Sequence, residues 1–254
     1  MEPEVRVVGR AVNGTVIRTF VGVVVAVVAA CANAPTSPDD GSQPNRIVIQ
    51  DPGGAIRAHE VLLRETLQAT LARVVEVLPM TALTITVSPN AARAIGGYGI
   101  GGFTTDGRTV DLFIDPAFPD LAGVLATRVA PMLAHEAHHA ARFRGAGYGR
   151  TLLEAMVSEG MADHFAIELL GAVVPPWSDA LAANETDAWL AQARPLFNSA
   201  AYGHERWFFG TTPEIPRWAG YTLGYRPIDR YKQSHPGATA VTLVNTQANT
   251  FRPF

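Results

Sequence analysis

The 254-residue sequence has one cysteine, one lysine and no run of basic residues, and each scarcity excludes a class of protein. A single cysteine cannot form an internal disulfide or a cysteine-rich zinc module, so any metal must be bound by histidine and carboxylate side chains. The other positive charges are 19 scattered arginines, and the net charge is -3 with a pI near 6.2. We therefore expect no nucleic-acid partner.

Long hydrophobic runs are also lacking. The uncharged run at 20–30, about 11 residues, is too short to span a bilayer comfortably and is typical of a signal-peptide core. It ends in Val-Ala-Ala-Cys at Cys31, which resembles the bacterial lipobox, whose cysteine is lipidated and becomes the mature N-terminus. Residues 1–31 are thus predicted to be a lipoprotein-type signal peptide, and the protein to be exported and lipid-anchored outside the cytoplasm. The alternative is an ordinary signal peptide or short anchor with an incidental cysteine.

The rest of the chain divides into a tether and one domain. Residues 32–45 are rich in Pro, Ser, Asp and Gly and too poor in apolar residues to bury anything, so they are predicted to form a flexible tether. The sequence as a whole is 48% apolar, which is enough for a sizeable core. We expect residues 46–254 to form one domain.

Hydrophobic periodicity predicts a mixed α+β domain that is mainly helical with a small sheet. Strands are expected at 46–50, 83–88, 98–104 and 108–115, and helices at 55–78, 121–129, 131–143, 151–170, 184–196 and from Pro216 onward. The last two strands are predicted to form a hairpin around Asp106-Gly107. The aromatic stretch 199–214 is expected to be a loop, and 238–254 has only a weak helical pattern.

The sequence His-Glu-Ala-His-His at 135–139 falls inside the helix predicted for 131–143. Residues four apart on a helix share one face, so His135 and His139 can present ring nitrogens to one metal ion, and Glu136 flanks the same cavity. This is the H-E-x-x-H arrangement of zinc hydrolases. His138 faces another direction, so we assign it a packing or surface role.

A catalytic zinc needs three protein ligands and an open position for water, and two histidines with one glutamate are an established set. Glu159 follows His139 by 20 positions, which leaves room for the first helix to end, a loop to turn and the next helix to return past it. Glu159 is therefore the predicted third ligand. Glu154, on the same predicted helix, is the alternative.

The residues after Glu159 favour it over Glu154. Gly160 and Ala162 are small and would let this helix approach the first helix closely, at a cost in helix propensity of about 1 kcal/mol for the glycine. Asp163 shares a face with Glu159, and it could accept a hydrogen bond from the non-ligating ring nitrogen of His135.

Four motifs together resemble a known group of enzymes. They are the H-E-x-x-H sequence at 135–139, Glu-Gly-Met-Ala at 159–162, Pro-Trp at 176–177 and the W-x-G-Y-x-L-G-Y sequence at 218–225. The chain resembles the gluzincin metallopeptidases and, more narrowly, a bacterial family of zinc-dependent proteases of unknown substrate. The resemblance covers roughly residues 55–235.

The resemblance implies a zincin-like fold with a small sheet flanking the metal helix. It implies that Glu159 is the third zinc ligand and that Asp163 supports the site from outside the ligand set. The substrate would be a peptide or protein. Glu136 would take a proton from water and pass it to the leaving amine.

Two further features of the site are predicted less directly. A hydrogen bond to the oxyanion of the tetrahedral intermediate could come from Tyr221, Tyr225 or His204, with Tyr221 the first choice. Close helix packing is the simpler explanation of the tyrosine-bearing segment. Zinc peptidases commonly bind extended substrate along an edge strand beside the metal helix, and 110–115 is the candidate.

Two functions from other classes compete with peptide hydrolysis. One is a non-catalytic surface lipoprotein that holds zinc structurally or binds a partner, which would need a fourth ligand from His138, His164 or His204. The other is a zinc hydrolase of a non-peptide amide or ester.

Overall fold

The computed structural model describes residues 43–252 and residue 254. The expected signal peptide 1–31, with Cys31, lies outside the described residues, as does the expected tether up to residue 42. The tether's last residue contacts the domain: the Asn45 side chain donates to the Met80 carbonyl (2.9 Å) and accepts from the Leu83 amide (2.9 Å). The folded part therefore begins slightly before residue 46.

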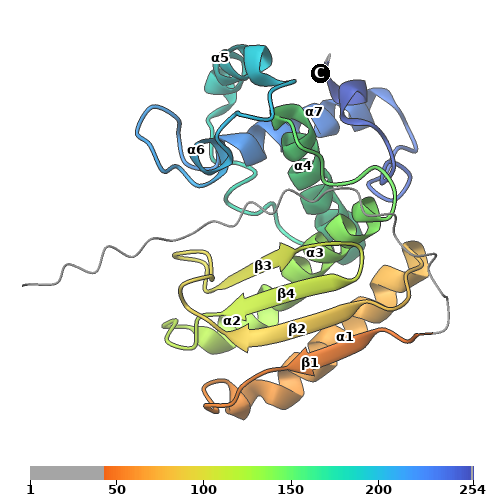
Figure 1. Ribbon diagram of the computed structural model, residues 1–254, viewed down its shortest axis with the longest axis vertical. Coiled ribbons are helices and arrows are strands. Elements are labelled where there is room, and N and C mark those ends of the chain that lie inside the picture. The colour runs from red at the N-terminus through yellow and green to blue at the C-terminus, as the bar shows by residue number, and fades with distance from the viewer. Residues whose placement is uncertain (1–42, 253) are drawn as a thin grey trace, which may run out of the picture. The chain divides into compact units, whose positions relative to one another are not determined.

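The strands form one four-stranded mixed sheet in the order β1-β2-β4-β3 (Figure 1). Their bounds are β1 Arg46–Ile49, β2 Thr84–Pro89, β3 Ile100–Thr104 and β4 Thr109–Ile114. β1, β2 and β4 run parallel, and β3 pairs antiparallel with β4. All four predicted strands and the β3–β4 hairpin are confirmed.

The predicted position of the edge strand is wrong. We expected residues 110–115 at the edge, but β4 lies between β2 and β3, so β3 is the edge strand next to the metal-motif helix. The two hairpin strands look equally suited to either position in the sequence. The parallel register of β2 against β4, which joins Ile85 to Val110, decides between them.

Seven α-helices accompany the sheet in the described part of the chain: α1 Glu60–Val77, α2 Leu121–Thr127, α3 Val129–Phe143, α4 Leu152–Leu170, α5 Ala183–Ala193, α6 His204–Phe208 and α7 Ala219–Ser234. α1 and α3 lie on one face of the sheet, and α4 to α7 lie beyond its β3 edge (Figure 1). The mixed, mainly helical α+β prediction is thus confirmed. Within these residues no helix is both long and apolar enough to cross a membrane.

The ends of α4 follow the signals in the sequence. The Thr151 side chain accepts from the Glu154 amide while the Glu154 side chain accepts from the Thr151 amide, which is a complete capping box. Gly171 ends the helix in the left-handed conformation, with φ of 67°. Because both ends of α4 are fixed, the direction in which each residue between them faces is fixed as well.

Two predictions in the C-terminal third need correction. The stretch 199–214 contains the short helix α6 rather than only a loop. The helix expected from Pro216 begins three residues later, at Ala219, because Trp218 before it adopts a left-handed backbone with φ of 68°.

The apolar interior has two parts that share α4. The sheet, α1 and α3 form one cluster, and residues 132–140 of α3 are all buried. α5, α6, α7 and the C-terminal residues form the other. α4 contributes Phe165 to the first and Met156 to the second, and its residues 155–166 are buried throughout. The metal motif therefore lies where the two clusters meet.

Glycines allow α4 and α7 to touch backbone to backbone. A Cβ on Gly160 would lie 2.4 Å from the carbonyl carbon of Gly224, and a Cβ on Gly224 would lie 1.8 Å from the Met156 carbonyl oxygen. The prediction that Gly160 brings α4 close to the metal-motif helix is therefore wrong, because its partner is α7. Close packing of the tyrosine-bearing helix through its glycines is confirmed.

Gly224→Ala is expected to lower the free energy of unfolding by about 3 kcal/mol, the upper end of the cost of overpacking, because backbone atoms cannot rotate away from the added methyl group. Gly53→Ala is the control, since a Cβ there would meet nothing within 4 Å. Chemical denaturation of both variants checks the expectation. Equal stability of the two variants would show that the helices separate at little cost.

Candidate metal centre

His135 and His139 lie one turn apart on α3 with their ring nitrogens facing each other. Their Nε2 atoms are 3.0 Å apart, and the ring planes are nearly perpendicular, at 84°. Both side chains are almost fully buried, with exposed fractions of 7% and 4%. The four-residue spacing alone puts the two rings on one face, and burial of α3 puts that face inside the protein.

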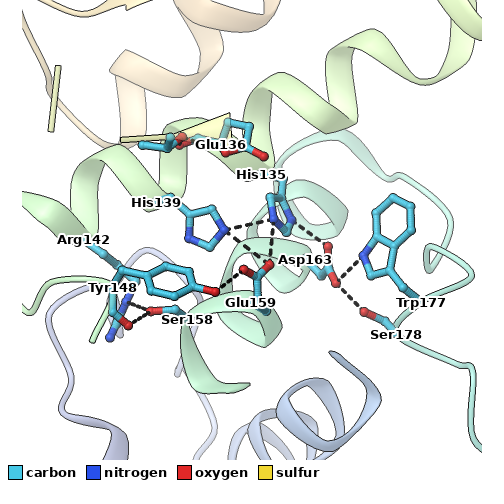
Figure 2. Close-up of polar contacts among 11 residues, drawn as sticks. His135, Glu136, His139, Arg142, Tyr148, Ser158, Glu159, Asp163, Trp177 and Ser178 are labelled. Atoms are coloured by element: carbon cyan, nitrogen blue, oxygen red, sulfur yellow. Dashed lines mark hydrogen bonds and ion pairs between the residues drawn. The ribbon is translucent and has the colours of Figure 1, made fainter. Parts of the chain in front are cut away.

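α4 brings Glu159 against the same pair. Its Oε2 lies 3.2 Å from Nε2 of His135 and 3.4 Å from Nε2 of His139. Figure 2 shows the three side chains pointing toward one another. Within the described residues, they form one group whose potential ligand atoms all lie within 4.8 Å of one another, and we call it the three-residue cluster.

The donor set of the three-residue cluster fits a zinc ion. In neutral His135 the one ring proton lies on Nδ1, which donates to Asp163 at 2.7 Å, so Nε2 can offer its lone pair to a metal, and Glu159 offers a carboxylate oxygen. Ligand atoms about 2.0–2.1 Å from a tetrahedral zinc are separated from one another by about 3.3 Å. The observed separations of 3.0, 3.2 and 3.4 Å match that value.

Asp163 is fixed on the far side of His135 by two further donors. Its Oδ2 accepts hydrogen bonds from Nε1 of Trp177 (2.9 Å) and from the Ser178 hydroxyl. Burial alone would lower the pKa of His135, but Asp163 and Glu159 outweigh it and hold that pKa well above its ordinary value. The site therefore attracts positive charge at His135.

Tyr148 holds the other oxygen of Glu159 and was not predicted from the sequence. Its hydroxyl donates to Oε1 at 2.7 Å, which leaves Oε2 facing the imidazoles. Burial, and then Glu159, raise the pKa of Tyr148 well above its ordinary value, so it remains a hydrogen-bond donor. The only signal for it in the sequence is its position between Gly147 and Gly149, both of which have positive φ.

The charge state of Glu159 suits a ligand. Burial would raise its pKa, but His139 and His135 outweigh this effect and hold the pKa well below its ordinary value. A carboxylate that stays ionised in the interior is an effective metal ligand, because metal binding needs the deprotonated form.

Glu136 lies apart from the ligand side chains, on the other side of the imidazoles from Glu159 in Figure 2. It is 5% exposed. Its Oε2 accepts a hydrogen bond from the Thr104 hydroxyl of β3 at 2.7 Å. Burial raises the pKa of Glu136, although the two histidines and Thr104 oppose the shift. A raised pKa brings a carboxylate closer to the range in which it can both accept and return a proton near neutral pH.

Of the three candidates for contacting an oxyanion, Tyr221 packs against a residue of the site, because its ring neighbours Trp177, which donates to Asp163. Burial raises the pKa of Tyr221 well above the ordinary value, and Glu159, Asp163 and Glu136 all raise it further. Packing against Trp177, with ring centroids 6.2 Å apart, helps to hold it there.

The other two candidates have ring and hydrogen-bond partners of their own. The Tyr225 ring stacks on His164 with centroids 4.0 Å apart, and the Tyr225 carbonyl accepts from Nε2 of His164. His204 is hydrogen-bonded to the Tyr202 hydroxyl at 2.9 Å and stacks on Phe208.

The remaining alternatives for a ligand lie away from the three-residue cluster. His138 contacts the Ala240 carbonyl at 3.3 Å, and its ring packs on Phe165. Glu154 uses its Oε2 to accept from the backbone amides of Arg150 and Thr151. Neither residue joins the three-residue cluster in the described part of the chain.

Comparison with known proteins agrees with this geometry. Curated proteins gave no match to the chain. The model of one family, described as "Predicted Zn-dependent protease (DUF2268)", matches residues 63–252. The match spans the sheet from β2 onward, the H-E-x-x-H helix, α4 and α7. The chain belongs to this family of predicted zinc-dependent proteases.

Proposed function

We propose that the protein is a zinc-dependent peptidase that hydrolyses peptide bonds with activated water. The observation that supports it best is the buried three-residue cluster with a separate carboxylate beside it. Three protein ligands leave a fourth position open, which is the mark of a catalytic rather than a structural zinc site. When bound, the metal would polarise the scissile carbonyl and lower the pKa of water.

In this proposal each residue has a separate task. His135, His139 and Glu159 hold zinc, and Asp163 keeps His135 in the tautomer that leaves Nε2 free. Glu136 takes a proton from the attacking water and delivers it to the leaving amine.

The oxyanion of the tetrahedral intermediate is assigned to Tyr221. Its phenol stays protonated because burial and three neighbouring carboxylates raise its pKa. It can therefore donate a hydrogen bond to a developing negative charge.

The proposed location is the outer face of a bacterial membrane. The support is the sequence ending at Cys31, followed by a polar segment that would separate the domain from the lipid. A peptide or protein outside the cytoplasm would then be the substrate.

Glu136→Gln is expected to keep the metal and lower kcat by about 10²- to 10⁴-fold, the usual contribution of a general base. Zinc content measured by elemental analysis and cleavage of a peptide library, with and without chelator, check both parts. Glu76→Gln, an exposed carboxylate on α1, is the control.

Equal activity of Glu136→Gln and the parent would contradict the proposed mechanism. A parent that binds zinc but cleaves no peptide would favour a structural zinc site. Chelator-sensitive hydrolysis of non-peptide amides, without cleavage of peptides, would favour a zinc hydrolase of a non-peptide amide or ester.

Loss of an outer hydrogen-bond partner of a metal ligand weakens metal binding by roughly 10- to 100-fold. Glu159→Ala removes a ligand itself, so we expect it to weaken zinc binding by more than that. Glu154→Ala should bind zinc normally and lose only about 1 kcal/mol of stability, because its carboxylate caps α4. Zinc titration against a competing chelator separates the two. Loss of zinc in Glu154→Ala but not in Glu159→Ala would reverse the assignment.

Cys31→Ser is expected to move the protein from the membrane fraction to the soluble fraction of a bacterial host and to abolish labelling by a fatty-acid analogue. Each buried CH₂ of an acyl chain contributes about 0.8 kcal/mol to membrane binding, and the serine variant would carry no acyl chain. Unchanged membrane association with no labelling of the parent would identify an ordinary anchor instead.

A further inference from the structure

We propose that the edge strand β3 positions Glu136 through two residues, with Gly102 providing space for the carboxylate and Thr104 fixing one of its oxygens. This inference rests on the proposed function, in which Glu136 is the general base. It concerns residues that contribute no metal ligand and lie on a different element from the H-E-x-x-H motif.

Thr104 contacts Glu136 at two points. Its hydroxyl lies 2.7 Å from the carboxylate Oε2 and 3.0 Å from the main-chain carbonyl oxygen of the same residue. A hydroxyl has one proton to donate, and the charged carboxylate is the stronger acceptor. Thr104 is 8% exposed, so water has little access to compete for that bond.

Gly102 lies directly against the same carboxylate. A Cβ at this position would be 2.4 Å from Oε1, 2.5 Å from Cγ and 2.7 Å from Cδ of Glu136. The Glu136 side chain thus occupies the space that any other residue at 102 would fill. All three of these atoms belong to the Glu136 side chain and none to a backbone, so an alanine would displace Glu136 rather than disrupt the strand.

The geometry of a strand explains why these two residues act together. Residues 102 and 104 point to the same face of β3, and Phe103 points to the other face, where it is half exposed. Backbone pairing with β4 sets the positions of Gly102 and Thr104 along the strand. Gly102 lies opposite Leu112 and Thr104 opposite Val110, and these two β4 residues are fully buried. The sheet core therefore determines where the carboxylate lies.

The arrangement divides the work between the two carboxylate oxygens. Oε2 is engaged by Thr104, so Oε1 is the oxygen available to take a proton from water. The missing side chain at Gly102 provides the room that Oε1 occupies. Both residues act as positioning residues because they reach the reaction only through Glu136.

The test compares Gly102→Ala with Gly96→Ala in the full-length, zinc-loaded protein. Gly102→Ala should lower kcat about 100-fold, the effect expected from moving a reacting group by about 1 Å, with KM and zinc content unchanged. Its Tm should stay within about 4 °C of the parent, because the strand itself tolerates alanine. A Cβ at Gly96 meets nothing within 4 Å, so that variant should match the parent.

Variants of Thr104 provide an independent test. Thr104→Val keeps the shape but removes the donor, and kcat should fall about 10-fold with KM unchanged. Thr104→Ser restores the hydroxyl and should recover most of the loss. Thr70→Val, which removes a buried hydroxyl on α1, controls for loss of stability alone.

Combining Gly102→Ala with Glu136→Gln should be no slower than Glu136→Gln alone, because both changes act through one group. Crystal structures of the parent and Gly102→Ala provide a readout that needs no activity. The Glu136 carboxylate should shift while the three-residue cluster stays in place.

The outcomes separate this inference from the proposed function. A parent that cleaves no peptide would overturn the function, and the crystal structures would still decide the positioning role. An unmoved Glu136 in Gly102→Ala would overturn the inference. Parent-like kcat in both Gly102→Ala and Thr104→Val would do the same while leaving the function intact.

Discussion

Two imidazole nitrogens and a carboxylate oxygen meet within 3.4 Å in the interior, and a positive charge between them would make that meeting favourable. Each of these polar groups loses hydration when buried, and the loss must be offset by a partner. The surrounding hydrogen bonds orient the lone pairs toward one point. Asp163 accepts a hydrogen bond from Nδ1 of His135, and Tyr148 donates one to Oε1 of Glu159. The rest of the domain holds these atoms in place.

Different elements of the fold position the ligands and the carboxylate of Glu136. α3 carries two ligands in a fixed relation because a single helical turn separates them. Glu159 comes from another helix, so its position depends on how α4 is held, and α4 is held by backbone contact with α7 through Gly160 and Gly224. The carboxylate of Glu136 faces the sheet instead. Ligand geometry and general-base geometry are thus controlled from opposite sides of α3.

The elements that define the metal centre could be predicted from the sequence because their signals are local. Helix periodicity, the capping box at Thr151 and the Gly171 stop all depend on neighbours along the chain, and they place Glu159 and Asp163 on one face of α4. What could not be predicted depends on pairing between distant segments. The hairpin pattern does not say which strand joins β2, and the glycine at 160 does not say which helix it faces. Tyr148 and Thr104 lie in a glycine-rich turn and a short strand, where side-chain direction follows from tertiary packing.

The helix α4 joins the two apolar clusters and also supplies Glu159 and Asp163. Opening either cluster would loosen α4, the helix that completes the metal centre. Neither half of the domain could then unfold without disturbing the ligands. Under the proposed function, ion release and loss of tertiary structure would be one cooperative event, and zinc binding to the native state would add to the stability of regions far from the ligands. Free zinc concentration would then govern how long the folded protein survives.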